Sequence, residues 1–384
     1  MASLRQVRRR RGRQAAGGAN ELEQTTQTLS TGPYDPAFEQ HIIDHNVLPP
    51  EYESPDGEEA PEPENKDEIV EVLKRRRRSL SPSRFTQTDF KRFKRANANA
   101  KGVSQVMANV VPVLEGGAVD SSCAARDVRF SNLQHLTDGT LTCAKPDLYY
   151  GSRPEKLEPA IRQELTNLVV PSKQHALPVA PNHFLEASGM SGSLAVATRQ
   201  VTYDTALGSR GLHALQTYGV DDPPYDNRAR TLGWTYHGWT LNAYASHLIP
   251  PSAPGGQPGY ATTPVGSWAM TSDLDTFRRG ASAFRNGREW AELQREEAIA
   301  QANQTAAGRD DESGGEAAEE EETPEATGGQ VTSSEGGSPS TRSSAETSAD
   351  ELSLNYEPPP KPRRGKGEMA ADAAASKPGP GNEE

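Results

Sequence analysis

The sequence predicts an α/β or α+β fold in which a central mixed sheet is flanked by helices, with long disordered termini. The first observation is that apolar residues recur at helical spacing in some segments of residues 81–304 and gather in short strand-like runs in others. The second is residues 181–218, where a short apolar run, a glycine turn and an alanine-rich run predict a buried strand followed by a helix. The third is the hydrophobic content of 33%, which is too low for all 384 residues to enter a core.

Composition divides the chain into four segments. They are a disordered basic N-terminal arm (1–33), short helices with an acidic and basic linker (34–80), a folded domain (81–304) and a disordered C-terminal tail (305–384). The net charge is −12, but basic residues without acidic ones occupy residues 5–13, whereas Asp and Glu dominate residues 310–325. A local block of charge decides binding more than the net charge of the chain does, so the negative net charge does not exclude nucleic acid as a partner.

Several features indicate where the protein acts. Cys123 and Cys143 are too few for a disulfide framework or a zinc set. No apolar run is long enough to span a bilayer and no secretory signal is visible, so we expect an intracellular protein without a membrane partner. The arginine cluster at residues 8–13 is typical of nuclear import signals, which favours the nucleus over the cytoplasm, although a solvated tail without an address has the same composition.

Helices are expected in the first part of the chain. Residues 34–47 and 67–73 carry apolar residues at helical spacing, and residues 74–84 form a second basic block with serines beside arginines. A helix from Phe85 to before Pro112 carries basic residues on its outer side, namely Lys91, Arg92, Lys94 and Arg95. This interleaving of aromatic and basic residues is typical of a helix that faces nucleic acid, and a basic outer face is also routine for amphipathic helices.

The remaining elements follow from alternation, turn residues and periodicity. Strands are predicted at residues 110–114, 128–136, 141–143, 147–150 and 184–187, with a hairpin turn at Asp138-Gly139. Helices are predicted at residues 157–168, 194–218 and 273–304. Residues 230–236 and 240–247 form an aromatic-rich hairpin around Gly238, and residues 250–258 form a loop.

Two acidic residues stand at the ends of predicted strands. Asp147 follows Pro146, and Glu186 lies where the strand at residues 184–187 ends. A hard divalent cation prefers oxygen ligands that neutralise its charge and leave space for water. Such a metal can activate water and stabilise charge on a phosphodiester. The pair therefore predicts a site for a hard divalent cation, whereas the simpler interpretation is that both are ordinary strand-end acids.

The order of these motifs resembles that of the PD-(D/E)XK phosphodiesterases, which have the restriction-endonuclease-like fold. The matching positions are Pro146-Asp147, then Glu186-Ala187-Ser188, then Gln200 with Tyr203 on the following helix. The resemblance implies that Asp147 and Glu186 hold a Mg²⁺ ion and that Asp147, Glu186, Ser188 and Gln200 form the catalytic set. Ser188 stands where the family has a lysine that assists the attacking water, and Arg199 or Lys173 are candidates to replace its charge.

The sequence thus predicts a divergent nuclease-like domain that binds nucleic acid through its basic segments, with weakened or lost metal-dependent phosphodiesterase activity. The alternative is a non-enzymatic intracellular protein-interaction module whose charged tails engage protein partners. Residues 34–303 are also similar to a group of uncharacterised proteins of filamentous fungi with the same order of motifs, a similarity that implies no activity.

Overall fold

The computed structural model describes residues 30–117, 120–174, 176–253 and 255–315, with side chains to residue 309. The arginine cluster at residues 8–13 and the predicted tail beyond residue 315 lie outside these ranges. Within the described ranges, no helix combines the length and the apolar character needed to cross a bilayer.

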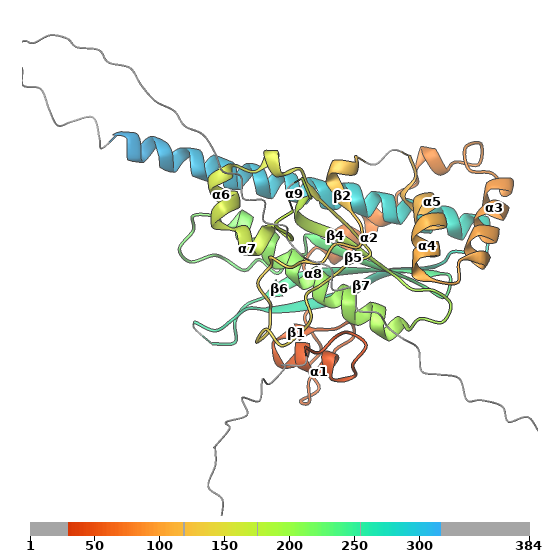
Figure 1. The fold of residues 1–384 in the computed structure, drawn as a ribbon, viewed down its shortest axis with the longest axis horizontal. Helices are drawn as coiled ribbons and strands as arrows, with labels where there is room; N and C mark the ends of the chain where they lie inside the picture. Colours follow the sequence, from red (N-terminus) through yellow and green to blue (C-terminus); the bar gives the residue numbers. More distant parts are fainter. Residues whose placement is uncertain (1–29, 118–119, 175, 254, 316–384) are drawn as a thin grey trace, which may run out of the picture. The chain divides into compact units, whose positions relative to one another are not determined.

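Seven strands of the described part form one mixed sheet in the order β1-β7-β6-β5-β4-β3-β2 (Figure 1). They are β1 (Val47–Leu48), β2 (Ala124–Ala125), β3 (Leu148–Ser152), β4 (Val179–Ala187), β5 (Thr231–His237), β6 (Thr240–Ile249) and β7 (Gly259–Ala269). The neighbours β1 and β7 are parallel, as are β4 and β5, and the other pairs are antiparallel. Helices cover both faces, so the predicted fold class is confirmed.

The two faces of the sheet bury different hydrophobic clusters. Side chains alternate along each strand, so Tyr149 and Phe184 pack with α1 (Ala37–Asp44) and α8 (Leu194–Gln216), whereas Leu148 and Leu185 pack beneath α9 (Leu274–Gly315). Helix α8 connects the parallel strands β4 and β5. The site described below depends on this connection, because α8 lies on the same face as every second side chain of β3 and β4.

Small residues let α8 approach the sheet closely. A Cβ atom at Gly208 would lie 2.7 Å from the Phe184 ring and 2.8 Å from the carbonyl oxygen of Pro181. On the strand side, a Cβ atom at Gly233 would lie 2.4 Å from a methyl carbon of Val201. Neither position has room for a larger residue.

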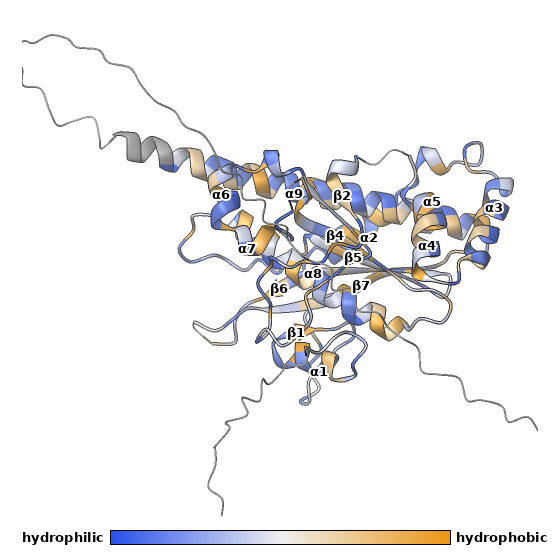
Figure 2. Cartoon of the chain, in the orientation of Figure 1, coloured by the Kyte–Doolittle hydropathy of each residue, from blue (hydrophilic) through white to orange (hydrophobic). Residues whose placement is uncertain are grey.

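The face under α9 is completed by helices from the first third of the chain. These are α2 (Lys66–Lys74), α3 (Gln87–Asn99), α4 (Val103–Asn109) and α5 (Val111–Glu115), with the short 3₁₀ helix η1 (Arg78–Leu80). The Phe277 ring of α9 lies 4.6 Å from Phe85 and 4.4 Å from Phe93. Asn286 donates to the carbonyl oxygens of Val72 and Arg75 and so satisfies the C-terminus of α2. Figure 2 shows that α3 presents mainly hydrophilic residues, whereas α4 and α5 are largely apolar.

Helix α9 also packs near α6 (Pro159–Glu164), which with α7 (Thr166–Val169) replaces the single helix predicted at residues 157–168. The helices predicted at residues 194–218 and 273–304 and the hairpin around Gly238 are confirmed as α8, α9 and the β5–β6 pair. Helix α9 continues past residue 304 to Gly315. Residues 34–80, expected to be short helices and a linker, supply β1 to the sheet and buried Ile69 and Leu73 to the core, so the folded part begins before residue 81.

Three predicted strands, at residues 110–114, 128–136 and 141–143, are wrong, and β1, β2 and β7 were not predicted. Residues 110–114 belong to helix α5, because Pro112 has no N–H to lose in a first helical turn and the apolar side chains pack under α9. Around Asp138-Gly139 no hairpin forms, since the Asp138 carboxylate accepts the Thr140 N–H at 3.0 Å and makes a local turn instead. Strand β7 was not predicted, because its glycines and Pro264 obscure the alternation.

Candidate functional site

Asp147 and Glu186 face each other across two antiparallel strands. Asp147 directly precedes β3, and because Leu148 pairs with Leu185, Asp147 lies opposite Glu186. The contact is reciprocal. The Asp147 N–H donates to Glu186 Oε1 at 3.3 Å, and the Ala187 N–H donates to Asp147 Oδ2 at 2.8 Å. The structure therefore brings the two acidic residues together at the end of β4, on the face that α8 covers.

Helix α8 adds a third carboxylate that sequence reasoning missed. Asp204 is as buried as Glu186, each being 2% exposed, and the two carboxyl groups share a hydrogen bond. Asp204 Oδ2 has no hydrogen-bond partner among the described residues. A buried carboxylate oxygen without a donor is costly, so this group of acids requires protons or a cation.

The pKa values of the three carboxyl groups are all raised. Burial raises the pKa of Asp147 to about 6, although the hydrogen bond from Ala187 opposes the shift. Burial and the charge of Asp147 raise the pKa of Asp204 to about 7, against the hydrogen bond with Glu186. For Glu186, burial and the charges of both neighbours raise the pKa well above its usual range. Shifts of this kind are typical of functional sites in which carboxylates share a proton or a cation.

Ser188, at the position of the family lysine, contacts a histidine of the neighbouring strand. Its Oγ lies 2.6 Å from His237 Nδ1, and its N–H donates to the carbonyl oxygen of Tyr236 at 2.9 Å. The parallel pairing of β4 and β5 carries His237 to this edge of the sheet. A hydroxyl–imidazole pair can move a proton, but unlike a lysine it does not carry a permanent ammonium group.

The predicted helix residues take different positions. Gln200 is half-buried and lies one turn before Asp204, so the two side chains share one face of α8. Tyr203 has a structural role, because its hydroxyl oxygen accepts the Leu136 N–H at 3.3 Å within the cluster that includes α1. Asp204 follows Gln200 by one helical turn and stands among small and apolar residues. This spacing is the sequence signal that could have identified Asp204.

Neither candidate for the missing lysine charge reaches Ser188. Arg199 forms an ion pair with Glu39 at 3.0 Å and donates to the carbonyl oxygen of Pro33 at 3.2 Å. Lys173 lies in the segment before β4, at the end of that strand opposite to Glu186.

An open pocket of about 520 Å³ has Asp147 in its wall. Helix α4 forms the opposite wall with Val103 and Met107, and Arg126 and Asp127 complete the rim. Asp147 is only partly buried and lines this pocket, whereas Glu186 is enclosed and does not line it.

Exposed apolar side chains border the same end of the sheet. Met190 is 53% exposed, and Leu194 and Trp239 are each 40% exposed. Trp239 and Gly238 form the two-residue turn between β5 and β6 with φ values of 69° and 54°. A left-handed conformation costs a tryptophan roughly 1 kcal/mol or more, so the turn holds this exposed ring at some expense in stability.

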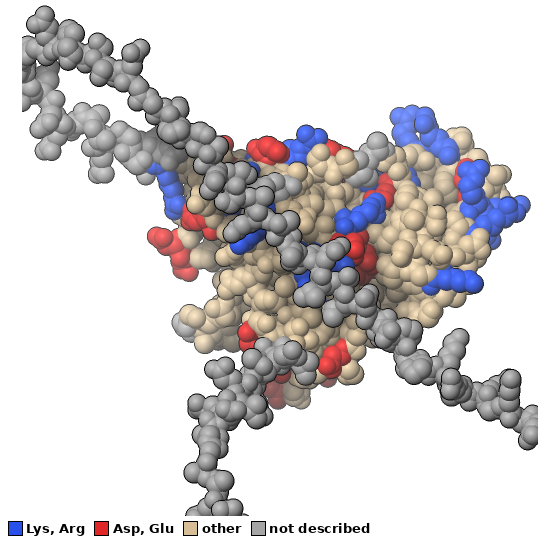
Figure 3. Space-filling view, viewed as in Figure 1, with Lys and Arg blue, Asp and Glu red and all other residues tan. Residues whose placement is uncertain are grey.

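A basic surface lies on α3. On the face shown in Figure 3, Lys and Arg side chains gather over the end of the domain that contains α3, with few acidic side chains between them. Lys91, Arg92, Lys94 and Arg95 of this helix are all exposed. Phe90 and Phe93 of the same helix are buried, so its aromatic residues belong to the core and its basic residues alone face outward.

One group of metal-binding residue types in the described ranges has its ligand atoms all within 4.8 Å of one another: His41, His45 and Asp138. His41 Nε2 lies 3.1 Å from Asp138 Oδ1, and His45 Nδ1 lies 2.8 Å from the carbonyl oxygen of His41. These contacts account for the group without a metal. The oxygens of Asp147, Glu186 and Asp204 do not meet the same spacing, so among the described residues these three acids do not form one ready-made set of cation ligands.

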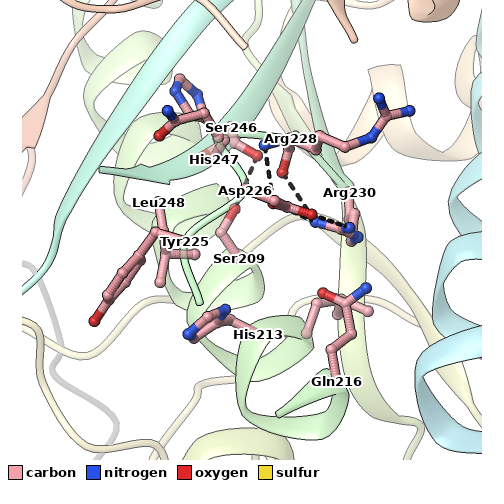
Figure 4. A pocket seen from close by; sticks show the side chains of 12 residues that line it. Ser209, His213, Gln216, Tyr225, Asp226, Arg228, Arg230, Ser246, His247 and Leu248 are labelled. Carbon is pink, nitrogen blue, oxygen red and sulfur yellow. Dashed lines mark hydrogen bonds and ion pairs between the residues drawn. The ribbon is translucent and has the colours of Figure 1, made fainter. Parts of the chain in front are cut away.

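A second cavity, between α8 and β6, is not a candidate for substrate binding (Figure 4). Its volume of about 20 Å³ is enough for roughly one water molecule. Asp226 in its wall accepts hydrogen bonds from Arg230, and the His213 and His247 rings point in different directions. The cluster of Asp147, Glu186 and Asp204 is therefore the main candidate site.

Comparisons with protein-family models, with curated proteins and with solved structures found no match. His237 and Asp204 are the two site residues that the sequence did not indicate, because strand pairing and a helical crossover bring them to Glu186.

Proposed function

We propose that the domain is a divergent nuclease-like protein that binds nucleic acid and a divalent cation, with weakened phosphodiesterase activity. The observation that carries this proposal is the reciprocal contact of Asp147 and Glu186, backed by buried Asp204. The resemblance to PD-(D/E)XK phosphodiesterases is supported by the order of elements: a strand after Asp147, an antiparallel strand with Glu186, a helix, and a strand parallel to the second.

Asp147 and Glu186 are the residues that would hold a Mg²⁺ ion, with Asp204 adding negative charge behind them. The donor set is suitable, since both residues offer carboxylate oxygens, and buried Asp204 beside them has an oxygen without a hydrogen-bond partner among the described residues. When bound, such a metal activates water and stabilises charge on a phosphodiester. The chain contributes the hydroxyl–imidazole pair of Ser188 and His237, which can hold or move a proton beside Glu186 but lacks the lysine charge. Weakened activity follows from that difference.

Nucleic acid is the proposed substrate class because the surroundings suit a polyanion with aromatic bases. The exposed basic residues of α3 supply positive charge on the helix that precedes the α4 wall. Exposed Trp239 at the edge of the sheet offers a surface on which a base can stack.

The first test is metal-dependent cleavage. Purified full-length protein is incubated with single- and double-stranded DNA and RNA in Mg²⁺ or Mn²⁺. We expect slow cleavage by the wild type and none by Asp147→Asn. Calorimetric titration with Mn²⁺ alone gives a second readout, in which Asp147→Asn should bind the ion roughly tenfold more weakly or worse.

Asp222→Asn is the matched control, because Asp222 is an exposed acid whose side chain makes no hydrogen bond or ion pair with another described residue. It should bind metal and cleave as the wild type does. Metal binding by the wild type without cleavage would favour a site that has lost catalysis, and Ser188→Lys should then restore some activity. Absence of both metal and nucleic-acid binding would reject the proposal in favour of the protein-interaction module.

An intracellular, nuclear location is part of the same proposal. It rests on the arginine cluster at residues 8–13 of the sequence. Deletion of residues 1–13 should shift a fluorescently tagged protein from the nucleus to the cytoplasm. An unchanged distribution would reject the import role of this cluster.

A further inference from the structure

A separate pocket of about 330 Å³ lies between the chain around η1 and the first turns of α9. Its size is at the lower end of the range for small-molecule sites, roughly 300 to 1,000 Å³. Six cationic side chains line it: Lys74, Arg76, Arg77, Arg78, Arg278 and Arg279. Asp275 is the one carboxylate among its lining residues, and Ser282 of α9 is buried in its wall.

Acidic neighbours neutralise only half of this charge. Lys74 pairs with Glu71 at 2.8 Å, Arg77 with Glu289 at 2.5 Å, and Arg279 with Asp275 at 3.4 Å. For the other three cations, Arg76, Arg78 and Arg278, the described residues offer no carboxylate within ion-pair distance. The pocket therefore carries a positive charge that the chain leaves unbalanced.

The unbalanced cations come from both walls. Arg76 and Arg78 lie in the segment from α2 to η1, and Arg278 belongs to α9. One guanidinium nitrogen of Arg278 donates to the Phe85 carbonyl oxygen at 2.7 Å, which fixes the side chain, while its buried Nε has no partner among the described residues. The positive environment extends inward, where burial and the charges of Arg77 and Arg288 lower the pKa of Arg285 to about 10.

We propose that this pocket binds a small polyphosphate anion, such as a triphosphate group, between η1 and α9. Guanidinium groups are suited to phosphate oxygens because they offer paired N–H donors in a rigid plane. Three unbalanced cations on two walls match several negative charges better than one, and the volume exceeds the size of a single phosphate. None of its lining residues belongs to the pocket at Asp147, so this site is independent of the proposed function.

The test uses the full chain and sodium tripolyphosphate in calorimetric titrations at two salt concentrations. We expect saturable binding of one anion that weakens as salt rises, and weaker binding of orthophosphate. The double variant Arg76→Ala with Arg78→Ala should bind tripolyphosphate roughly ten- to a hundredfold more weakly, since it removes two charge-assisted contacts. Both side chains are exposed and make no hydrogen bond with the described residues, so the variant should fold normally.

The matched control is Lys91→Ala with Arg95→Ala on α3, which removes the same charge outside the pocket. It should leave tripolyphosphate binding unchanged. Equal losses in the two double variants would show a general charge effect and overturn the proposal, as would the absence of saturation in the wild type. A pocket variant that loses duplex DNA binding but keeps tripolyphosphate binding would also overturn it, since the pocket would then contact nucleic acid instead.

Discussion

Asp147, Glu186 and Asp204 lie together in a largely buried cluster, so a change at any one of them should alter the stability of the domain. Glu186 and Asp204 are both 2% exposed, and each has a raised pKa because burial penalises its charge. The folded chain therefore binds protons more tightly at these groups than the unfolded chain does. Stability is therefore linked to the protonation of these carboxylates.

Asp204→Asn should remove part of the pH dependence of stability. The pKa of Asp204 is raised from 3.8 to about 7, so between these values the folded state holds more protons than the unfolded state. Raising the pH through this window should lower the free energy of unfolding of the metal-free protein, by up to about 1.4 kcal/mol per pH unit for one proton. Urea unfolding at pH 4.5 and pH 7.5 measures the difference, which should be smaller in the variant.

Mg²⁺ provides the control for that experiment. If the acids hold a cation, saturating Mg²⁺ should stabilise the wild type more at pH 7.5 than at pH 4.5, because the ion competes with protons. The same pH dependence in the variant as in the wild type would show that Asp204 is not the titrating group.

At the scale of the elements, the contact between α8 and the sheet holds the site together. Asp204 reaches Glu186 because the glycines of α8 and β5 allow the helix to lie directly on the strands. Gly208 occupies a helical position where alanine would ordinarily be favoured. Its retention there is explained by the Phe184 ring and the Pro181 carbonyl oxygen beneath it.

Gly208→Ala should destabilise the domain by roughly 1 to 3 kcal/mol, since overpacking outweighs the gain in helix propensity. Gly308→Ala in α9 is the matched variant, because nothing lies within 4 Å of a Cβ atom there. That change should stabilise the protein by up to about 1 kcal/mol. Thermal unfolding of the two variants beside the wild type measures both effects, and a stabilised Gly208→Ala would contradict this account of the packing.

Long periodic elements are the part of the fold that sequence reasoning predicted well. The periodicity of α8 and α9 extends over many turns, and the β5–β6 hairpin is marked by aromatic residues around Gly238. Strand β7 was not predicted, because it is defined by its pairing with β1 and β6, which the composition of the segment does not indicate. In the site, Asp147 and Glu186 were accessible through their motif, whereas Asp204 and His237 become neighbours of that motif only in the folded chain.

For the whole molecule, the distribution of charge matters more than its total. The net charge is −12, yet exposed basic residues gather on α3 and in the pocket beside η1. A polyanion approaching the domain meets these surfaces rather than the mean charge.

Lys91→Ala with Arg95→Ala should weaken duplex DNA binding across all sequences. Each phosphate contact contributes about 0.9 to the slope of log affinity against log salt, so losing two should reduce that slope by roughly 1.8. Fluorescence anisotropy over a series of salt concentrations gives both numbers. An unchanged slope would remove α3 from the proposed nucleic-acid surface, whatever the outcome for the pocket beside η1.

The position of α9 late in the sequence has a consequence for how the protein is made. Asn286 of α9 donates to Val72, 214 residues earlier in the sequence, and the Phe277 ring packs on Phe85 and Phe93. During synthesis the early helices therefore leave the ribosome long before the partner that covers their apolar sides. Contacts across such distances form slowly, and chains interrupted before α9 should expose this surface and aggregate or require chaperones.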